Sequence, residues 1–361
     1  MTPNTIFLLL GLFLLLVFVH ELGHFIVAKL SGAKVEEFGF GFPPRIFGIR
    51  RGETLYSVNL LPIGGFVRIF GEEGEHKGNP RSFASRPIYL RALTIGAGVV
   101  MNVILAFLLF SAAHGIGVST FLGDEDISQA KNTQVQIIEI VPNSPAELAG
   151  LETGDAILAV TRGEETILAK SAAEVQNAVE KFKGTEVSFK ILRAGEELNV
   201  LILPRVNPPA GEGAVGIAMA VTGVIAVPWY KAPIEGARTT YEALRALLGA
   251  FGDLAVSLFQ DGHLPEDVAG PVGIASFLGE MRDIGLVFIM QFAALLSLNL
   301  ALINIIPFPA LDGGRLLFIF IEWVKGSPVN RRFEKAAHAT GFAILIFLMI
   351  AITVRDVGKF F

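Results

Sequence analysis

Three residues that could bind a metal and transfer a proton, His20, Glu21 and His24, lie within the otherwise apolar stretch FLLLVFVHELGHFIVAKL. Helix positions four apart share one face, so the two imidazoles point at one place with the carboxylate beside them. This HExxH spacing predicts that the histidines bind zinc and that the glutamate acts as general base; in a soluble helix a chance match would be an equal alternative. In a membrane each ionisable residue costs roughly 2.5–3.5 kcal/mol, which zinc binding, worth about 10–16 kcal/mol in structural sites, can offset.

A second stretch, LNLALINIIPFPALDGGRLLF, offers the third protein ligand that a catalytic zinc site needs. Its aspartate, Asp312, ends a long uncharged run that begins after Asp283. Pro307 and Pro309 remove backbone donors and the glycines after Asp312 permit a tight turn, so the helix is predicted to unwind at membrane depth. We expect Asp312 to be the third ligand; the alternative is an aspartate at a helix end that faces the cytoplasm.

The composition indicates that these residues belong to a multi-pass membrane protein. Of 361 residues, 52% are hydrophobic and 17% are charged, and the mean hydropathy is +0.58, which is too apolar for an ordinary soluble protein. The absence of cysteine excludes disulfides and thiolate metal sites. The net charge of −5, with no polybasic run, gives no indication of a nucleic acid partner. Four segments are long enough to cross a membrane as helices: residues 6–30, 92–117, 284–311 and 336–354.

The distribution of lysine and arginine predicts the orientation of these helices. Both residue types are concentrated between the first and second spans and between the third and fourth. The positive-inside tendency makes both of these loops cytoplasmic. Both chain termini and residues 118–283 are therefore expected outside.

The outer segment is predicted to contain an α+β domain at residues 118–222, because short β-branched runs alternate there with turns and one polar helix. Its Ser-Pro-Ala, Ala-Gly-Leu and Gly-Asp-x-Ile elements resemble the PDZ signature. PDZ domains bind an extended peptide at a sheet edge; a small α/β domain without a peptide ligand is the alternative. Residues 223–283 carry an apolar stripe at helical spacing, which predicts an amphipathic helix that lies on the membrane surface or packs against the PDZ-like domain.

The cytoplasmic loop LYSVNLLPIGGFVRIFGE alternates apolar residues around Gly64 and Gly65. This pattern predicts a β-hairpin that reaches toward the metal site and whose edge, with Phe66, pairs with an unwound substrate. A purely structural hairpin is the alternative. His338 has no partner at ligand spacing, and we expect it to be a surface or interfacial residue.

Four features follow one another along the chain: HELGH, the PDZ-like insert, GPVGIA at residues 270–275 and NIIPFPALDGG. Their order resembles the site-2 protease family of intramembrane zinc metalloproteases, in particular its bacterial regulator-of-sigma-E type. The resemblance implies a protease core of about four transmembrane helices, divided between residues 1–117 and 284–361. It implies one Zn²⁺ bound by three ligands, with Glu21 as the catalytic glutamate. The implied ligands are His20, His24 and Asp312.

Two asparagines also match family motifs. The stretch GAGVVMNVILAF in the second predicted span is similar to the family's GPxxN pattern, with Asn102 at the position of the asparagine. Ala97 or Val99 stands where that pattern usually has proline. Asn304 matches the first asparagine of NxxPxPxLDG. We expect Asn304 to hold the substrate backbone or the developing oxyanion, the alternative being a hydrogen bond that only packs helices. The expected substrate-binding residues are Asn304, Asn102, Gly64, Gly65 and Phe66.

For function, the resemblance implies cleavage of single-pass membrane proteins within or near their transmembrane segment. Implied substrates are an anti-sigma factor already trimmed by an upstream site-1-type protease, or remnant signal peptides. The resemblance also implies a membrane-reentrant β-loop and an active site near the cytoplasmic side of the bacterial cytoplasmic (inner) membrane. A zinc transporter and an inactive PDZ membrane scaffold are rival interpretations, but neither requires Glu21 together with all three ligands.

Overall fold

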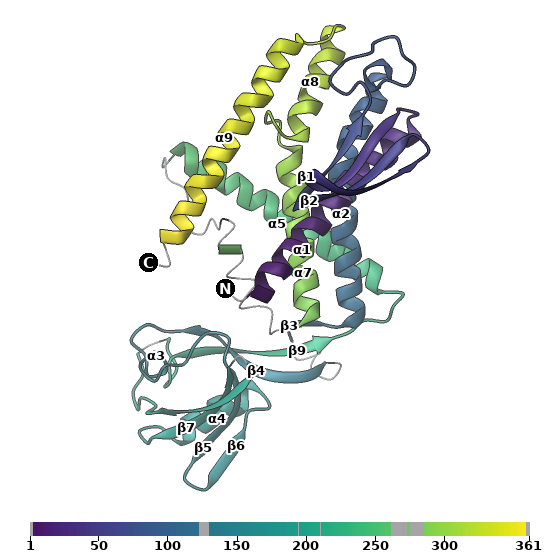
Figure 1. Ribbon diagram of the computed structural model, residues 1–361. Coiled ribbons are helices and arrows are strands. Elements are labelled where there is room, and N and C mark those ends of the chain that lie inside the picture. The colour runs from purple at the N-terminus through teal and green to yellow at the C-terminus, as the bar shows by residue number, and fades with distance from the viewer. Residues whose placement is uncertain are drawn as a thin grey trace. The chain divides into compact units, whose positions relative to one another are not determined.

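The structure is a computed structural model that divides into two compact units, residues 1–113 with 230–361 and residues 114–229 (Figure 1). The structure describes residues 3–122, 130–193, 195–209, 211–260, 270, 273–274 and 285–358.

The first unit is built mainly from long helices. These are α1 (Pro3–Leu30), α2 (Ile88–Ile116), α5 (Ala232–Gln260), α7 (Leu286–Ile305), α8 (Asp312–Lys325) and α9 (Arg331–Gly358), with a short 3-10 turn at Phe83–Ser85. Within the described part of the chain, four helices are long and apolar enough to cross a membrane, which confirms the four predicted spans. They are Phe7–Leu30, Ile88–Ile116, Leu286–Ile305 and Arg331–Gly358.

Small residues let these helices approach closely. A side chain at Gly23 of α1 would overlap the carbonyl group of Ala97 on α2, so only glycine permits this crossing. Farther along α2, Ala106 and Phe110 pack against Ala294 and Leu298 of α7 in a buried cluster. The metal-site helices α1, α2 and α7 therefore form a closely packed support.

The predicted amphipathic segment contains a helix, α5, and it packs within the first unit. Its Ala243 and Leu247 lie against the cluster shared by α2 and α7. Tyr241 and Leu248, which belong to the predicted apolar stripe, remain exposed. The helix therefore has one face on the helical core and a second apolar face exposed on the unit.

A sheet lies beside α1 in this unit (Figure 1). It consists of two long strands, β1 (Val35–Arg51) and β2 (Thr54–Ile69), joined by a two-residue turn at Gly52 and Glu53. Gly52 has φ of +60°, a value that suits glycine in such hairpin turns.

The prediction of a hairpin that turns at Gly64 and Gly65 was wrong in the position of the turn, because both glycines lie inside β2. The two halves of β2 do not pair with each other. Instead the first half of β1 lies between them, so that Gly39 has Phe66 as partner on one side and Ser57 on the other. Sequence alternation alone does not reveal which partner a strand takes, since that depends on residues outside the segment.

The second unit is an antiparallel sheet with two helices. Its strands are β3 (Val118–Phe121), β4 (Lys131–Ile140), β5 (Ala156–Arg162), β6 (Glu165–Leu168), β7 (Val187–Arg193), β8 (Glu196–Ile202) and β9 (Ile217–Ile225), in the order β3-β9-β4-β5-β7-β8 with β6 beside β5. Its helices are α3 (Pro145–Leu148) and α4 (Ala172–Lys181). This arrangement confirms an α+β region; the pairing of β3 with β9 was not predicted.

Reciprocal caps fix the starts of both helices in this unit. Ser171 accepts a hydrogen bond from the Glu174 amide, and the Glu174 carboxylate accepts one from the Lys170 amide. Ser144 and Glu147 repeat this arrangement at α3, a variant of the capping box in which the glutamate accepts from the amide just before the N-cap. The Ser-Pro-Ala motif of the sequence is thus a helix start.

The predicted GPVGIA segment lies mostly outside the described residues. Of its positions Gly270, Gly273 and Ile274 are described. The amides of Gly270 and Gly273 donate to one carboxylate oxygen of Asp356 on α9, at 2.8 and 3.0 Å. Asp356 is buried, and these two hydrogen bonds satisfy its charge in part.

Candidate metal centre

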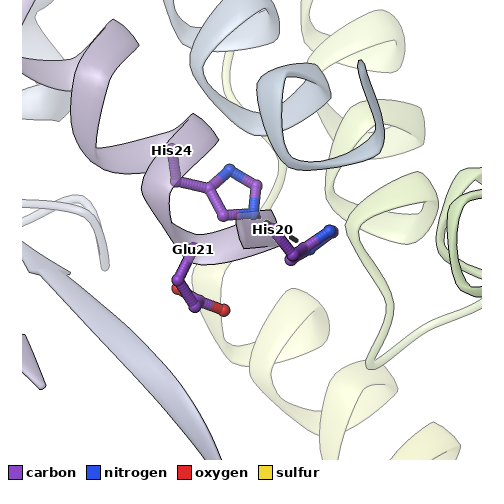
Figure 2. Close-up of side chains that lie close together, drawn as sticks. All are labelled: His20, Glu21 and His24. Atoms are coloured by element: carbon purple, nitrogen blue, oxygen red, sulfur yellow. Dashed lines mark hydrogen bonds between the residues drawn. The ribbon is translucent and has the colours of Figure 1, made fainter. Parts of the chain in front are cut away.

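The two histidines of HELGH lie on one face of α1, as their spacing predicts. The Nε2 atoms of His20 and His24 are 3.2 Å apart, and the rings meet edge to face with centroids 4.8 Å apart. Figure 2 shows the two rings with the Glu21 carboxylate beside them. Because both Nε2 atoms point to one place, the pair can hold one cation between them.

Asp312 joins this pair from the far end of the chain. Its Oδ2 atom lies 2.9 Å from Nε2 of His20 and 3.2 Å from Nε2 of His24. The turn at residues 306–311 ends α7 and starts α8 at Asp312, which confirms the predicted helix break. The proline-rich stretch thus delivers a carboxylate at the point where the imidazoles meet.

The geometry of this group fits a metal ion. In a tetrahedral zinc site with bonds of about 2.0–2.1 Å, ligand atoms lie about 3.3 Å apart. The three atoms of this site are separated by 2.9–3.2 Å, slightly closer than that spacing. Two imidazole nitrogens and a carboxylate are also the donor types of catalytic zinc sites.

His24 is held in the tautomer that a metal requires. Its Nδ1 lies 2.8 Å from the carbonyl oxygen of Thr94 on α2. A carbonyl oxygen only accepts, so Nδ1 carries the proton and Nε2 keeps a free lone pair. Metal-binding histidines in proteins commonly make this kind of outer hydrogen bond.

His20 has a comparable partner in Asn102. The Nδ2 atom of Asn102 lies 3.4 Å from Nδ1 of His20. Its Oδ1 is buried without a hydrogen-bond partner among the described residues. Exchanging the two ends of this amide would let Oδ1 accept a proton from Nδ1 and leave Nε2 of His20 free for a metal. The unsatisfied oxygen therefore supports the same metal-binding tautomer.

Gly98 is a site residue that the sequence analysis missed. A Cβ atom at this position would lie about 2.6–2.7 Å from atoms of both imidazole rings. At Gly96, about half a turn earlier on α2, no atom of a packed neighbour among the described residues comes within 4 Å of the corresponding position. Gly98 is therefore not free to change, because α2 comes that close to the ligands.

Three of the remaining predicted site residues, Gly64, Gly65 and Phe66, lie on β2. Gly65 is next to Glu21, since a Cβ at Gly65 would lie 3.6 Å from Cγ of Glu21. The Phe66 ring packs over Gly39 and stacks with Phe42, and Gly64 bends β2 with φ of +85°. The structure thus brings the 64–66 segment to Glu21.

Asn304 is half-buried near the end of α7. Its amide has no hydrogen-bond partner within the described ranges. The packing alternative, an interhelical hydrogen bond, is therefore not seen among these residues. Asn102 differs, because it is fully buried behind His20.

Two histidines and a glutamate on an apolar helix of membrane length, met by an aspartate at the start of α8, are the arrangement expected of a membrane metalloprotease. The sequence profile described as Peptidase family M50 matches residues 7–348. The chain belongs to this family, the site-2 protease family of zinc metalloproteases.

Individual relatives agree with this assignment. A candidate zinc metalloprotease of Clostridium perfringens, CPE1693, is 34% identical, with 98% of each chain covered. The zinc metalloprotease RasP of Geobacillus kaustophilus is 30% identical, with 96% of each chain covered. The regulator of sigma-W protease RasP of Bacillus subtilis is 28% identical over the full length of both chains.

Proposed function

We propose that this protein hydrolyses a peptide bond within or near the transmembrane segment of single-pass membrane proteins, with His20, His24 and Asp312 as Zn²⁺ ligands and Glu21 as catalytic base. The observation that carries the proposal is the convergence of three ligand atoms beside Glu21 inside apolar helices. The name of the Bacillus subtilis relative, a regulator of sigma-W protease, supports anti-sigma factors as a substrate class. Remnant signal peptides are a second class.

In the proposed reaction the metal, the general base and the residues that orient the metal ligands have separate roles. Zn²⁺, when bound, supplies polarisation of the scissile carbonyl and a water of lowered pKa. Glu21 would take a proton from the attacking water and return it to the leaving amide nitrogen. Thr94 and Asn102 hold His24 and His20 in the ligand orientation, so Asn102 acts as a positioning residue in addition to its predicted contact with substrate.

Asn304 is proposed to bind the substrate. Its half-buried amide has no partner among the described residues, so its donor is available for a substrate carbonyl or the developing oxyanion. Loss of one such donor typically costs about 2.7–4 kcal/mol of transition-state stabilisation.

The substrate strand is proposed to pair with β2. A transmembrane helix satisfies its own backbone and must unwind before hydrolysis. Residues 65–69 of β2 have strand partners only in the first half of β1 among the described residues, and Gly65 is next to Glu21. Addition of an unwound segment at the open edge would bring its peptide bonds to the metal centre. The sheet then acts as a membrane-reentrant element near the cytoplasmic side.

Single-cysteine cross-linking tests this pairing, because the natural chain has no cysteine. The Phe66→Cys variant is expected to form disulfides with every second position of a cysteine-scanned substrate, as strand pairing requires. The Ile49→Cys variant, at an exposed position of β1, serves as the control. Equal cross-linking from both positions, or no alternation along the substrate, would contradict strand addition.

The second unit is proposed to be a PDZ domain that binds the trimmed end of a substrate. β3 and the Leu122 amide cover residues 221–225 of β9, so among the described residues 217–220 have no partner along that edge. Helix α4 contacts β9, as a peptide groove between strand and helix requires. Such binding would favour substrates already cut by an upstream protease.

The protein is proposed to lie in the bacterial cytoplasmic membrane with both termini and the PDZ-like unit outside. The concentration of Lys and Arg in residues 31–87 and 312–335 supports this orientation.

Cleavage of a pre-trimmed single-pass reporter in reconstituted membranes tests the proposed function. The native chain is expected to cleave the reporter, and both Glu21→Gln and a zinc chelator are expected to stop cleavage. No cleavage by the native chain with zinc bound, across several reporters, would favour a zinc transporter or a PDZ scaffold. Zinc uptake into the vesicles, measured in parallel, distinguishes these two.

A further inference from the structure

The turn that presents Asp312 contains a residue in an unfavourable backbone conformation. Ala310 has φ of +82°, in the left-handed region that non-glycine residues rarely adopt. It lies two residues before Asp312, and the preceding Pro309 restricts the turn further. Such a conformation persists only where surrounding structure holds it.

Helix α9 supplies that support. The Ala310 amide donates a hydrogen bond of 2.8 Å to Nδ1 of His338. Gly341, three positions after His338 on the same helix, lies against the Pro309 backbone. A Cβ atom at Gly341 would overlap the Pro309 carbonyl. Both contacts come from one face of α9, because positions three apart share a face.

The hydrogen bond defines the state of the His338 ring. Nδ1 accepts the amide proton, so a neutral ring carries its own proton on Nε2. That Nε2 atom is buried without a hydrogen-bond partner among the described residues, and the ring lies beside Phe318, with centroids 5.5 Å apart. An unsatisfied buried donor is unfavourable, so stability alone does not account for a histidine here.

We infer that His338 is a positioning residue for the metal centre: by holding the Ala310 amide, it fixes the turn that brings Asp312 to His20 and His24. This inference rests on the proposed role of Asp312 as a metal ligand. Outer-shell residues of this kind typically change metal affinity or activity about 10–100-fold when they are lost.

Matched variants of His338 separate positioning from packing. An asparagine at this position would place an amide oxygen near the present location of Nδ1, whereas glutamine and leucine would not, so the test uses His338→Asn, His338→Gln and His338→Leu. We expect the glutamine and leucine variants to weaken Zn²⁺ affinity about 10–100-fold and the asparagine variant to retain most of it. The measurement is chelator competition on the purified full-length protein, with kcat/KM for a reporter as a second readout.

A second-site variant tests the backbone mechanism directly. Glycine adopts positive φ without strain, so Ala310→Gly in the His338→Leu background is expected to recover part of the lost Zn²⁺ affinity. Phe347→Leu, at an exposed position of α9, is the control. Equal losses for the three His338 variants, with no recovery by Ala310→Gly, would assign His338 to packing only and overturn the inference.

Asp312→Asn keeps the test separate from the proposed function. Unchanged Zn²⁺ affinity in Asp312→Asn would contradict the ligand role itself. A loss of affinity in Asp312→Asn with native affinity in His338→Leu would overturn only the inference. Thermal unfolding identifies any variant that fails to fold. If His338→Leu is one of them, the comparison of His338→Gln with His338→Asn decides: equal Zn²⁺ affinities in these two variants would overturn the inference.

Discussion

The Nε2 atom of His20 and the Oδ2 atom of Asp312 lie 2.9 Å apart, although 292 positions separate the two residues in the chain. This contact joins the first membrane helix to the start of α8. His24 Nε2 lies 3.2 Å from the same carboxylate oxygen, so the candidate metal centre combines residues from distant parts of the chain.

Glu21→Gln is expected to remove proteolysis and to retain the metal. General acid–base catalysis typically contributes about 10²–10⁴-fold, so kcat/KM should fall by about 100-fold or more. The amide keeps the size of the side chain, and Zn²⁺ content should stay near native. Reporter cleavage and metal analysis check this, with Glu164→Gln, at an exposed position, as the matched control. Residual activity near native would remove Glu21 from the mechanism.

Removal of the metal is expected to stop cleavage without unfolding the protein. The helices around the site are held by contacts that do not involve the ion, such as Ala106 and Phe110 of α2 against Ala294 and Leu298 of α7, and by the bond from His24 to Thr94. The metal adds stability according to its occupancy, about 2.7 kcal/mol at 100 times its Kd. Circular dichroism should therefore show unchanged helix content after chelation, with a lower Tm and full recovery of activity on adding Zn²⁺. Loss of helix content would show that the metal is needed for folding.

Gly98→Ala and Gly96→Ala make the same change on the same helix with different expected results. A methyl group at Gly98 would overlap both ligand rings, whereas one at Gly96 would meet no atom within 4 Å. We expect Gly98→Ala to weaken Zn²⁺ affinity by at least about 10-fold, as displaced ligand orientation does. Gly96→Ala should be neutral or slightly stabilising. Similar affinities for the two variants would show that the helices adjust freely.

Asp155→Asn is expected to destabilise the second unit. The buried Asp155 carboxylate accepts hydrogen bonds from Arg193 at 2.6 and 2.7 Å, and this contact raises the pKa of Arg193. Loss of such charged hydrogen bonds costs about 1.5–3 kcal/mol. Urea unfolding followed by limited proteolysis of the full chain measures the change.

The control for Asp155 is the exposed pair Lys190 and Glu197. Glu197→Gln should change the free energy of unfolding by less than about 1 kcal/mol, as exposed pairs do. If the two variants were equally stable, burial of Asp155 would not be the source of its contribution.

The sequence by itself determined the parts of this protein that depend on local pattern. Apolar runs of membrane length specify the four spans because lipid requires every backbone group to bond within its own helix. Spacing of four on α1 brings His20 and His24 together because the helix repeats every 3.6 residues. Pro307 and Pro309 end α7 because they lack backbone donors, and this made Asp312 recognisable as a candidate ligand.

Only the tertiary structure decided what depends on contacts between distant segments. The partners of β2 could not be predicted from residues 55–72, because β1 lies between its two halves. Gly98 carries no chemical signal of its own, and its role follows from how closely α2 approaches the imidazoles. His338 has no neighbour at ligand spacing, and its bond to Ala310 exists because α9 packs against the turn before Asp312. Local sequence thus specifies the ligands, and helix packing specifies the residues that hold them.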